Sequence, residues 1–415
     1  MQTKSGMPKW VKISGKIVIP VAILAIYIVF AVLFSQHTAT YNPYGSGAGG
    51  QVYFENATVQ SVDQQSISQT TFPGLYTGRQ LITVLVNSGQ YKGRTFQVNN
   101  ALNYDTNIVV HKGQSILVSI NTSTSDKSVI NVYMYAPNRF IPLLVLIGLF
   151  VAALCFVGGW RGFRSLLGIF FTLTTMLFVF VPLLLRGVPT FAATLVLVAV
   201  TSCVTLFLVG GLSRKSLSAV LGTVAGVVIS ILILLIFSNI MGISGYTSSD
   251  TDALLNIAGQ SRLQVGDLLY AGIIIASLGA VMDIAISVAT SVNEVLGHKP
   301  DADFKELFYA GMNVGRDMMG TMANTLILAF IGASVASFIL MYSYQVQFNQ
   351  LFNSSGIAVD ILEAVCGSLA VILTVPIVSA IAGKLLLPTD RQKPSAVQSS
   401  TPTATCGQGE NDTHD

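Results

Sequence analysis

Charged side chains are scarce in this chain. Of its 415 residues, only 10% are Asp, Glu, Lys or Arg, whereas 52% are hydrophobic. A soluble domain carries about 25% charged residues. The shortage predicts an integral membrane protein whose main surroundings are the lipid bilayer. The net charge of +3 is too small to indicate a nucleic-acid partner.

Cysteine and histidine are also few, with four of each. The cysteines have no metal-binding or redox spacing, and residues 36–139 contain none, so we expect no disulfide there. All four histidines lie outside the apolar segments, and the sequence has no H-E-x-x-H motif, P-loop or Cys/His cluster. These absences argue against an enzyme and give no residues for a cofactor.

Long apolar runs dominate the sequence instead. A helix that crosses a bilayer needs about 20 apolar residues. Eight segments meet this requirement, and we interpret the first as an uncleaved helix because its apolar run is too long for a secretory signal. The expected spans are 17–35, 140–159, 165–185, 190–210, 217–240, 267–291, 317–343 and 357–385. The predicted fold class is a membrane all-α bundle of eight transmembrane helices with a small extracytoplasmic β-domain.

The placement of Lys and Arg predicts the orientation in the cell membrane. Cytoplasmic connections carry an excess of these residues. They occur before the first span and in every second connection, whereas the other short connections carry only Arg186 and Arg262. We therefore expect both termini, 1–16 and the disordered tail 386–415, to be cytoplasmic. The seven-helix region is 140–385, and residues 36–139 lie outside.

The outer segment begins with a linker and continues as short alternating runs such as "LITVLV" and "SILVSI". Turn signals such as "NSGQYKG" separate these runs. The pattern predicts a small antiparallel β-barrel or sandwich of five or six strands, for which an OB-like topology is one option. No carboxylate or histidine cluster occurs in it, so binding or assembly is favoured over catalysis.

A polar row in the stretch "GAVMDIAISVATSVNEV" is the main functional candidate. An α-helix turns about 100° per residue, so Glu294 returns to within about 20° of Asp283. Ser287, Thr290 and Ser291 lie between them on the same side. A charge in the middle of a membrane helix costs about 2.5–3.5 kcal/mol on insertion scales, so such residues usually face partners or water.

The next span offers matching groups. Its stretch "GMNVGRDMMGTMANTLILA" places Asn313, Asp317, Thr321 and Asn324 on one face, with Arg316 beside them. If Ser291 and Arg316 are level at the membrane surface, Asp283 lies level with Asn324. The two rows are expected to form a buried polar seam. The seam could serve only to join two helices, or it could be a protonatable site on a substrate or proton path.

Two G-x-x-x-G motifs, Gly222 with Gly226 and Gly311 with Gly315, predict close helix packing. Contacts within the chain are favoured over dimerisation for both motifs.

Three of these stretches resemble the YibE/F-like family of bacterial multi-span membrane proteins: "GAVMDIAISVATSVNEV", "AGMNVGRDMMGTMANTLILAFIG" and "GGWRGFRSLLG". The resemblance covers about residues 139–385, and the outer domain is similar to that of YibE-type members. It implies a related YibE/F-type membrane protein as a partner. The arrangement is more loosely similar to RND permeases and the SecD/SecF proteins, which use proton flux through intramembrane carboxylates.

Together these observations predict a proton-linked transporter or permease component for an unknown small solute. Asp283 is the expected proton or ion site, and Asn324, Thr321 and Asp317 are expected to line it. Arg316, Glu294 and Asn313 are expected to gate its cytoplasmic mouth. The competing hypothesis is a non-transporting assembly or scaffold protein whose outer β-domain binds an envelope partner.

Overall fold

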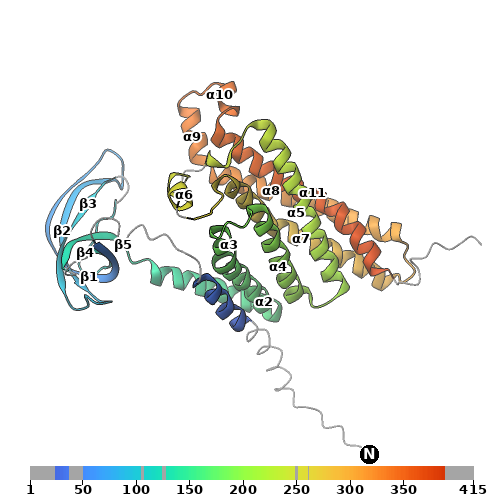
Figure 1. Ribbon diagram of the computed structural model, residues 1–415, viewed down its shortest axis with the longest axis horizontal. Coiled ribbons are helices and arrows are strands. Elements are labelled where there is room, and N and C mark those ends of the chain that lie inside the picture. The colour runs from blue at the N-terminus through green and yellow to red at the C-terminus, as the bar shows by residue number, and fades with distance from the viewer. Residues whose placement is uncertain are drawn as a thin grey trace, which may run out of the picture. The chain divides into compact units, whose positions relative to one another are not determined.

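The computed structural model divides into two compact units (Figure 1). The first unit comprises residues 1–188 and 252–264, and the second comprises 189–251 and 265–415. The structure describes residues 24–36, 50–103, 107–123, 128–247, 251–259 and 261–387. The expected cytoplasmic N-terminus and nearly all of the expected C-terminal tail lie outside these residues, as does part of the first expected span.

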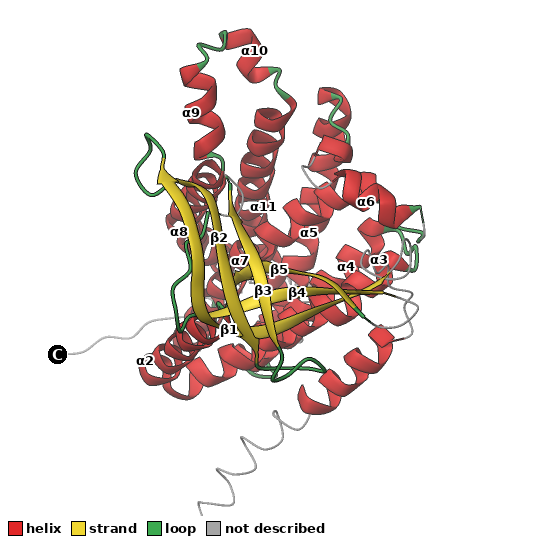
Figure 2. Ribbon diagram, turned by 90° about the vertical axis from the view of Figure 1, so that its left-hand side faces the viewer, coloured by secondary structure: helices red, strands yellow, loops and turns green. Residues whose placement is uncertain are grey.

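Five strands of the first unit form a closed barrel (Figure 2). They are β1 (Gly50–Gln69), β2 (Tyr76–Val86), β3 (Thr95–Leu102), β4 (Ser115–Ser123) and β5 (Val129–Pro137). Their order round the barrel is β1-β2-β3-β5-β4. The pairs are antiparallel except that β3 and β5 run parallel where Asn99 meets Tyr133. The expectation of a wholly antiparallel domain was therefore wrong, because directions cannot alternate all the way round a closed ring with an odd number of strands.

The barrel interior follows the two-residue period of its strands. Along β2, Ile82, Val84 and Val86 are buried while the residues between them are only partly so. Residues of β1, β3 and β4 complete the same core, including Val59, Val98, Ile116, Val118 and Ile120. The alternating sequence thus gives this domain a hydrophobic core of its own.

One polar side chain, Gln80, is completely buried in this core. Its Oε1 accepts hydrogen bonds from the Asn100 amide and from the backbone N–H of Val110, both at 3.0 Å. Its Nε2 donates to the carbonyl oxygen of Val110 at 3.1 Å. Gln80 therefore links the segment that contains Val110, which comes after β3 in the chain, to strands β2 and β3.

The helices of the first unit are Leu24–Gln36, α2 (Phe140–Thr175), α3 (Val181–Leu185) and α6 (Thr251–Ala258), with one π-helical turn between α2 and α3. Those of the second unit are α4 (Thr190–Gly210), α5 (Arg214–Met241), α7 (Leu268–His298), α8 (Phe304–Ala333), α9 (Val335–Ser343), α10 (Phe348–Phe352) and α11 (Ser355–Leu386). Among the described residues, five helical runs are long and apolar enough to cross a membrane, or six if α8 and α9 are one span bent by 58°.

The run Phe140–Leu185 counts as one of these five, although two spans were expected there. Gly159, at φ 53° and ψ −134°, breaks its helical geometry. A Cβ on Gly162 would lie 2.1 Å from the carbonyl oxygen of Leu154, eight residues earlier. In a straight helix these two levels are about 12 Å apart. The chain therefore turns back sharply at Gly159, close to the expected boundary between the second and third spans.

In the second unit, α11 packs against α5, α7 and α8, and α7 also contacts α4, α5 and α8 (Figure 1). Apolar residues of α7 fill the centre of this bundle, among them Ile273, Ile274, Val281 and Ile284. Each of these four is at most 1% exposed. The helix that carries Asp283 is therefore surrounded by protein on most of its circumference.

We predict that residues 51–137 fold alone, with strand-type circular dichroism and a cooperative urea transition. In this fragment Gln80→Leu should lower the free energy of unfolding by about 1–3 kcal/mol, because both Val110 backbone groups lose a buried partner. Gln64→Leu, at an exposed position of β1, is the matched control. A random-coil spectrum, or equal effects of the two substitutions, would contradict this account.

A second prediction concerns Asp63 on β1. Hydrogen bonds from Ser61 and Thr83, and a weaker one from Gln97, lower the pKa of its carboxyl below the ordinary value. Because the pKa of Asp63 is lower in the folded barrel than in the unfolded chain, the ionised carboxylate stabilises the folded barrel. This contribution is present at pH values above the unfolded-state pKa of about 3.9. That contribution is lost as the pH falls through the folded-state pKa.

The melting temperature of the wild-type fragment should therefore exceed that of Asp63→Asn at neutral pH. The difference should shrink as the pH falls below about 4. A difference that stays constant with pH would show that the hydrogen bonds do not favour the carboxylate.

Candidate functional site

Glycine contacts set the positions of α5 and α8 on α11. A Cβ on Gly222 or Gly226 of α5 would lie 2.2 Å from Val378 or 2.0 Å from Thr374. On α8, a Cβ on Gly311 would lie 2.6 Å from Ser379, and one on Gly315 would lie 2.1 Å from Val375. All these partners are on α11. The predicted use of both G-x-x-x-G motifs in packing within the chain is confirmed.

Two further contacts fix the register of α7 against α8. A Cβ on Gly311 would lie 2.9 Å from Val292, and a Cβ on Gly367 of α11 would lie 3.4 Å from Ser277 and 3.9 Å from Leu326. Asp283 is nine residues before Val292, and Gly320 is nine residues after Gly311. Asp283 is also six residues after Ser277, and Gly320 is six residues before Leu326, so the second contact gives the same pairing of Asp283 with Gly320. Asp283 is therefore level with Gly320, next to Thr321.

The same register places the other predicted residues. Asn324 lies level with Gly279, one turn from the level of Asp283, and Asp317 lies level with Ile286. Arg316 is level with Ser287, one turn deeper than the assumed Ser291. Glu294 is level with Tyr309, seven residues before Arg316, so the two expected gate residues differ by about 10 Å in depth.

The predicted site residues are exposed on the second unit. This holds for Asp283, Glu294, Asn313, Arg316, Asp317, Thr321 and Asn324, while Ser287, Thr290 and Ser291 are half-buried. No hydrogen bond or ion pair within the described part of the chain joins the row on α7 to the row on α8. The expected burial of the seam is corrected accordingly: the two rows lie at matching depths, but both are exposed and do not meet.

The reason lies in which faces the two helices use to pack. They meet through Val292 and Gly311 and, beside Gly367, through Ser277 and Leu326. Asp283 lies about 180° from Val292 round α7, since nine residues are two and a half turns. Sequence periodicity placed the polar residues on one side of each helix but did not identify the neighbour of that side.

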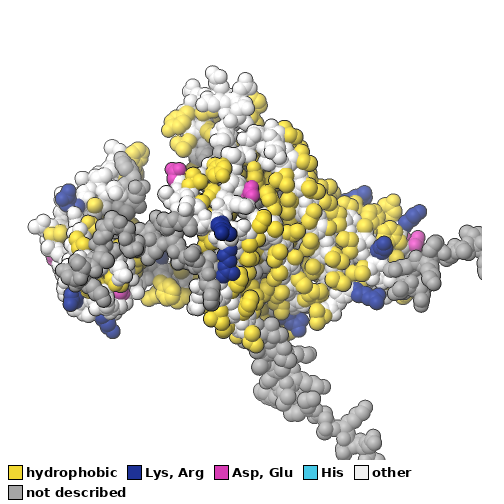
Figure 3. All heavy atoms as spheres, viewed as in Figure 1, with side chains coloured by type: hydrophobic (Ala, Val, Ile, Leu, Met, Phe, Trp, Pro, Cys, Tyr) yellow, Lys and Arg dark blue, Asp and Glu magenta, His cyan; other side chains and the backbone are white. Residues whose placement is uncertain are grey.

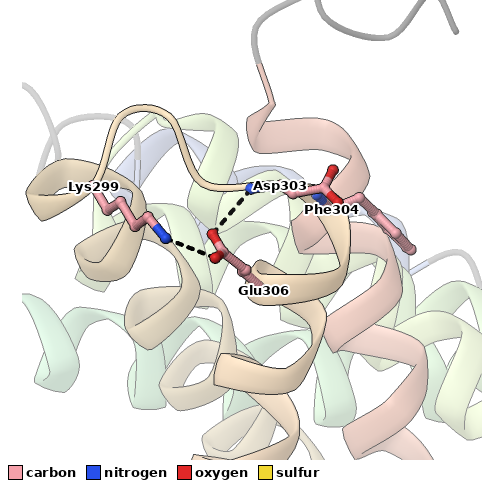
Figure 4. A network of polar contacts seen from close by, with 4 residues as sticks. All are labelled: Lys299, Asp303, Phe304 and Glu306. Atoms are coloured by element: carbon pink, nitrogen blue, oxygen red, sulfur yellow. Dashed lines mark hydrogen bonds and ion pairs between the residues drawn. The ribbon is translucent and has the colours of Figure 1, made fainter.

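The turn between α7 and α8 is held by polar contacts that the sequence analysis missed (Figure 4). The Asp303 carboxylate accepts a hydrogen bond from the N–H of Phe304 at 2.7 Å, and the Glu306 carboxylate accepts one from the N–H of Asp303 at 3.2 Å. Lys299 Nζ lies 2.6 Å from Glu306 Oε1. The signal was present as an Asp-x-x-Glu capping box in "DADFKE".

Two carboxylates in α11 were also missed. Asp360 and Glu363 are half-buried and belong to a helix that is long and apolar enough to cross a membrane. Glu363 is four residues before Gly367, so it lies on the α11 face that approaches Ser277 and Leu326. The sequence feature that could have identified them is an acidic residue within a predicted membrane span.

Buried hydroxyl groups are a third feature to which the sequence analysis gave no role. Within the described residues, the side-chain oxygens of Ser202, Thr205, Thr223 and Ser230 have no hydrogen-bond partner. They lie on α4 and α5. Serine and threonine in helices commonly bond to a carbonyl one turn earlier, as Thr201 does with Leu197 at 2.7 Å. These four hydroxyls are therefore open to another polar partner.

The long apolar helices and the barrel indicate a membrane protein with an additional β-domain. The family model of the YibE/F-like proteins matches residues 146–387, more than half of the chain. The chain therefore belongs to the YibE/F-like family, as the sequence motifs predicted. Searches of curated proteins and of solved structures returned no match.

The glycine contacts yield a third prediction. Gly315→Ala should destabilise the protein by about 1–3 kcal/mol, because the new methyl group overlaps the completely buried Val375. Gly332→Ala on the same helix is the control, since its Cβ would meet nothing within 4 Å. Thermal stability of the purified protein in detergent measures both. Equal melting temperatures would show that α8 is not seated on α11 through Gly315.

Proposed function

We propose that the protein is a proton-linked membrane transporter or permease component in which Asp283 carries the proton. The observation that supports this most directly is the position of the carboxylate. It lies in the middle of the 31-residue helix α7, on an exposed strip of small and polar residues, and α8 carries polar residues at the same depth. Ionisable residues inside a membrane are costly and usually mark ion or substrate pathways.

Neighbouring residues supply complementary chemistry. Thr321 is next to the residue level with Asp283, and its hydroxyl can accept or donate a hydrogen bond. Asn324 and Asp317 lie about one turn to either side along α8. A proton delivered to Asp283 would cancel its charge and turn one carboxyl oxygen into a hydrogen-bond donor. Such a change could favour one arrangement of α7 and α8 over another, which is what coupling to a solute requires.

The cytoplasmic side of the pathway is proposed to carry the remaining polar groups. Asn313 and Arg316 precede Thr321 along α8, and Glu294 follows Asp283 along α7. Since the α7–α8 turn contains Lys299 and the next helix begins near Lys305, the positive-inside rule favours a cytoplasmic position for this turn. Both termini would then be cytoplasmic and the barrel extracytoplasmic, with eight spans in the cell membrane.

A scaffold function is the second candidate, and a surface of the barrel favours it. Phe54 on β1 and Tyr135 on β5 are exposed, and their ring centroids are 4.9 Å apart. Tyr133 and Ile130 on β5 are exposed as well. Exposed aromatic residues are typical of protein-binding surfaces. The strand order with a parallel β3–β5 pair supports an OB-like assignment, and this surface would bind an envelope protein or a related YibE/F-type chain.

The fourth prediction separates the two functions. In a deletion strain with a measurable growth or uptake defect, Asp283→Asn should abolish pH-dependent complementation while protein levels in the membrane stay near normal. Asn retains the size and hydrogen bonding of Asp but cannot cycle a proton. Asp283→Glu should keep partial activity because the acid remains.

Asp267→Asn, at the residue before α7, is the control and should complement fully. If Asp283→Asn also complements fully while Asp283→Leu lowers protein levels, Asp283 has a structural role and the scaffold function is favoured.

A further inference from the structure

The exposed surface of α7 contains no large apolar side chain. Over residues 272–294 its exposed residues are Gly272, Ala276, Gly279, Asp283, Asn293 and Glu294. A Cβ on Gly272 or Gly279 would meet nothing within 4 Å. A narrow, open strip of small and polar residues therefore runs along a helix that is otherwise buried.

The exposed surface of α8 has the same character over residues 313–325. Its members are Asn313, Arg316, Asp317, Gly320, Thr321, Asn324 and Thr325. Each is polar or glycine, although α8 belongs to a helix pair that is apolar enough overall to cross a membrane. We call these exposed residues of α8 the polar face. The strip on α7 lies on another side, since Asp283 is about 180° round α7 from Val292, which contacts α8.

The other long helices of the second unit expose a different surface. Large apolar side chains are exposed on α4, α5 and α11: Val196, Val200, Leu217, Leu221, Leu232, Ile236, Ile361, Val365 and Ile372. Figure 3 shows hydrophobic side chains covering the outside of α4 and α5. This is the surface expected of helices in contact with lipid. The polar face is thus confined to one sector of the unit.

Hydrocarbon is a poor neighbour for the polar face. Charged residues at the depth of Arg316 and Asp317 need a polar partner, and small residues such as Gly320 in membrane helices usually allow another helix to approach closely. The first half of α2 exposes mainly large apolar residues, for example Leu149, Phe150 and Phe156, so it offers few matching groups. A chain with both charge signs at the depth of Arg316 and Asp317 would fit.

We propose that the polar face binds the polar face of a second copy of this chain. Two copies inserted in the same direction are related by a twofold axis along the membrane normal, so equivalent residues have equal depth. Arg316 and Asp317 are neighbours on α8 and have opposite charges. Across the axis, each Arg316 can therefore pair with Asp317 of the other copy, giving two equivalent ion pairs.

The contact does not include Asp283, which lies on another side of α7 from the residue that meets α8. The contact and the proton-linked role remain separate claims. A crosslink reports the contact whether or not Asp283 carries a proton.

The experiment places single cysteines on the polar face and on the lipid-facing surface at one depth. Thr321→Cys and Asn324→Cys test the polar face, and Leu232→Cys on α5 is the control. Leu232 lies six residues after Gly226 and Thr321 six after Gly315, and these two glycines contact adjacent residues of α11. The native Cys155, Cys203, Cys366 and Cys406 are replaced by alanine.

Two differently tagged copies are expressed together and oxidised in membranes. We expect a crosslinked band with both tags for Thr321→Cys and Asn324→Cys and at least tenfold less for Leu232→Cys. Arg316→Asp should abolish the band, and Arg316→Asp combined with Asp317→Arg should restore it. A photoreactive amino acid at Thr321 gives the same readout in a chain that keeps its native cysteines.

Three results would overturn the proposal. The first is a Thr321 crosslink only to a different protein, which would assign the polar face to another chain. The second is an equally strong crosslink at Leu232. The third is the absence of any band with both tags for both cysteine positions and the photoreactive variant.

Discussion

The contact of α5 and α8 with α11 is the constraint on which the arrangement of the second unit depends. Glycines on both helices leave no room for a side chain against Thr374, Val375, Val378 and Ser379 of α11. Close approach of this kind is the usual means by which membrane helices gain packing energy where the hydrophobic effect does not act. With α8 seated in this way, its rotation about its own axis is fixed as well.

That rotation determines where the polar residues of α8 point. Gly311 and Gly315 must face α11, so Asp317, Thr321 and Asn324 are directed away from it. Rotating α8 to bury its polar row would remove both glycines from α11 and place large side chains there. The outward position of the polar row is therefore a consequence of helix packing, and the row is available to water, to a solute or to another protein.

Sequence periodicity predicted much of this, but not all of it. It identified the G-x-x-x-G motifs, the polar rows and the alternating strands, because each depends only on the local helical or strand repeat. It missed the exposure of Asp283, because exposure depends on which face α7 turns toward its neighbours. The parallel β3–β5 pair was missed for a similar reason, since it follows from closure of the whole barrel. Glu363 was overlooked although an acid in an apolar run is visible in the sequence.

The exposure of Asp283 bears on the proposed chemistry. A carboxylate that exchanges protons must at times meet water, so it cannot be sealed in a tightly packed core like that around Ile284. A carboxylate at the same depth cannot face hydrocarbon without a large cost either. The open strip on α7 meets both requirements, because it exposes no large apolar side chain and a Cβ on Gly272 or Gly279 would meet nothing within 4 Å, which leaves room for water beside the carboxylate. Gly279, about one turn from Asp283, is then needed for space at the carboxylate rather than for packing within the chain.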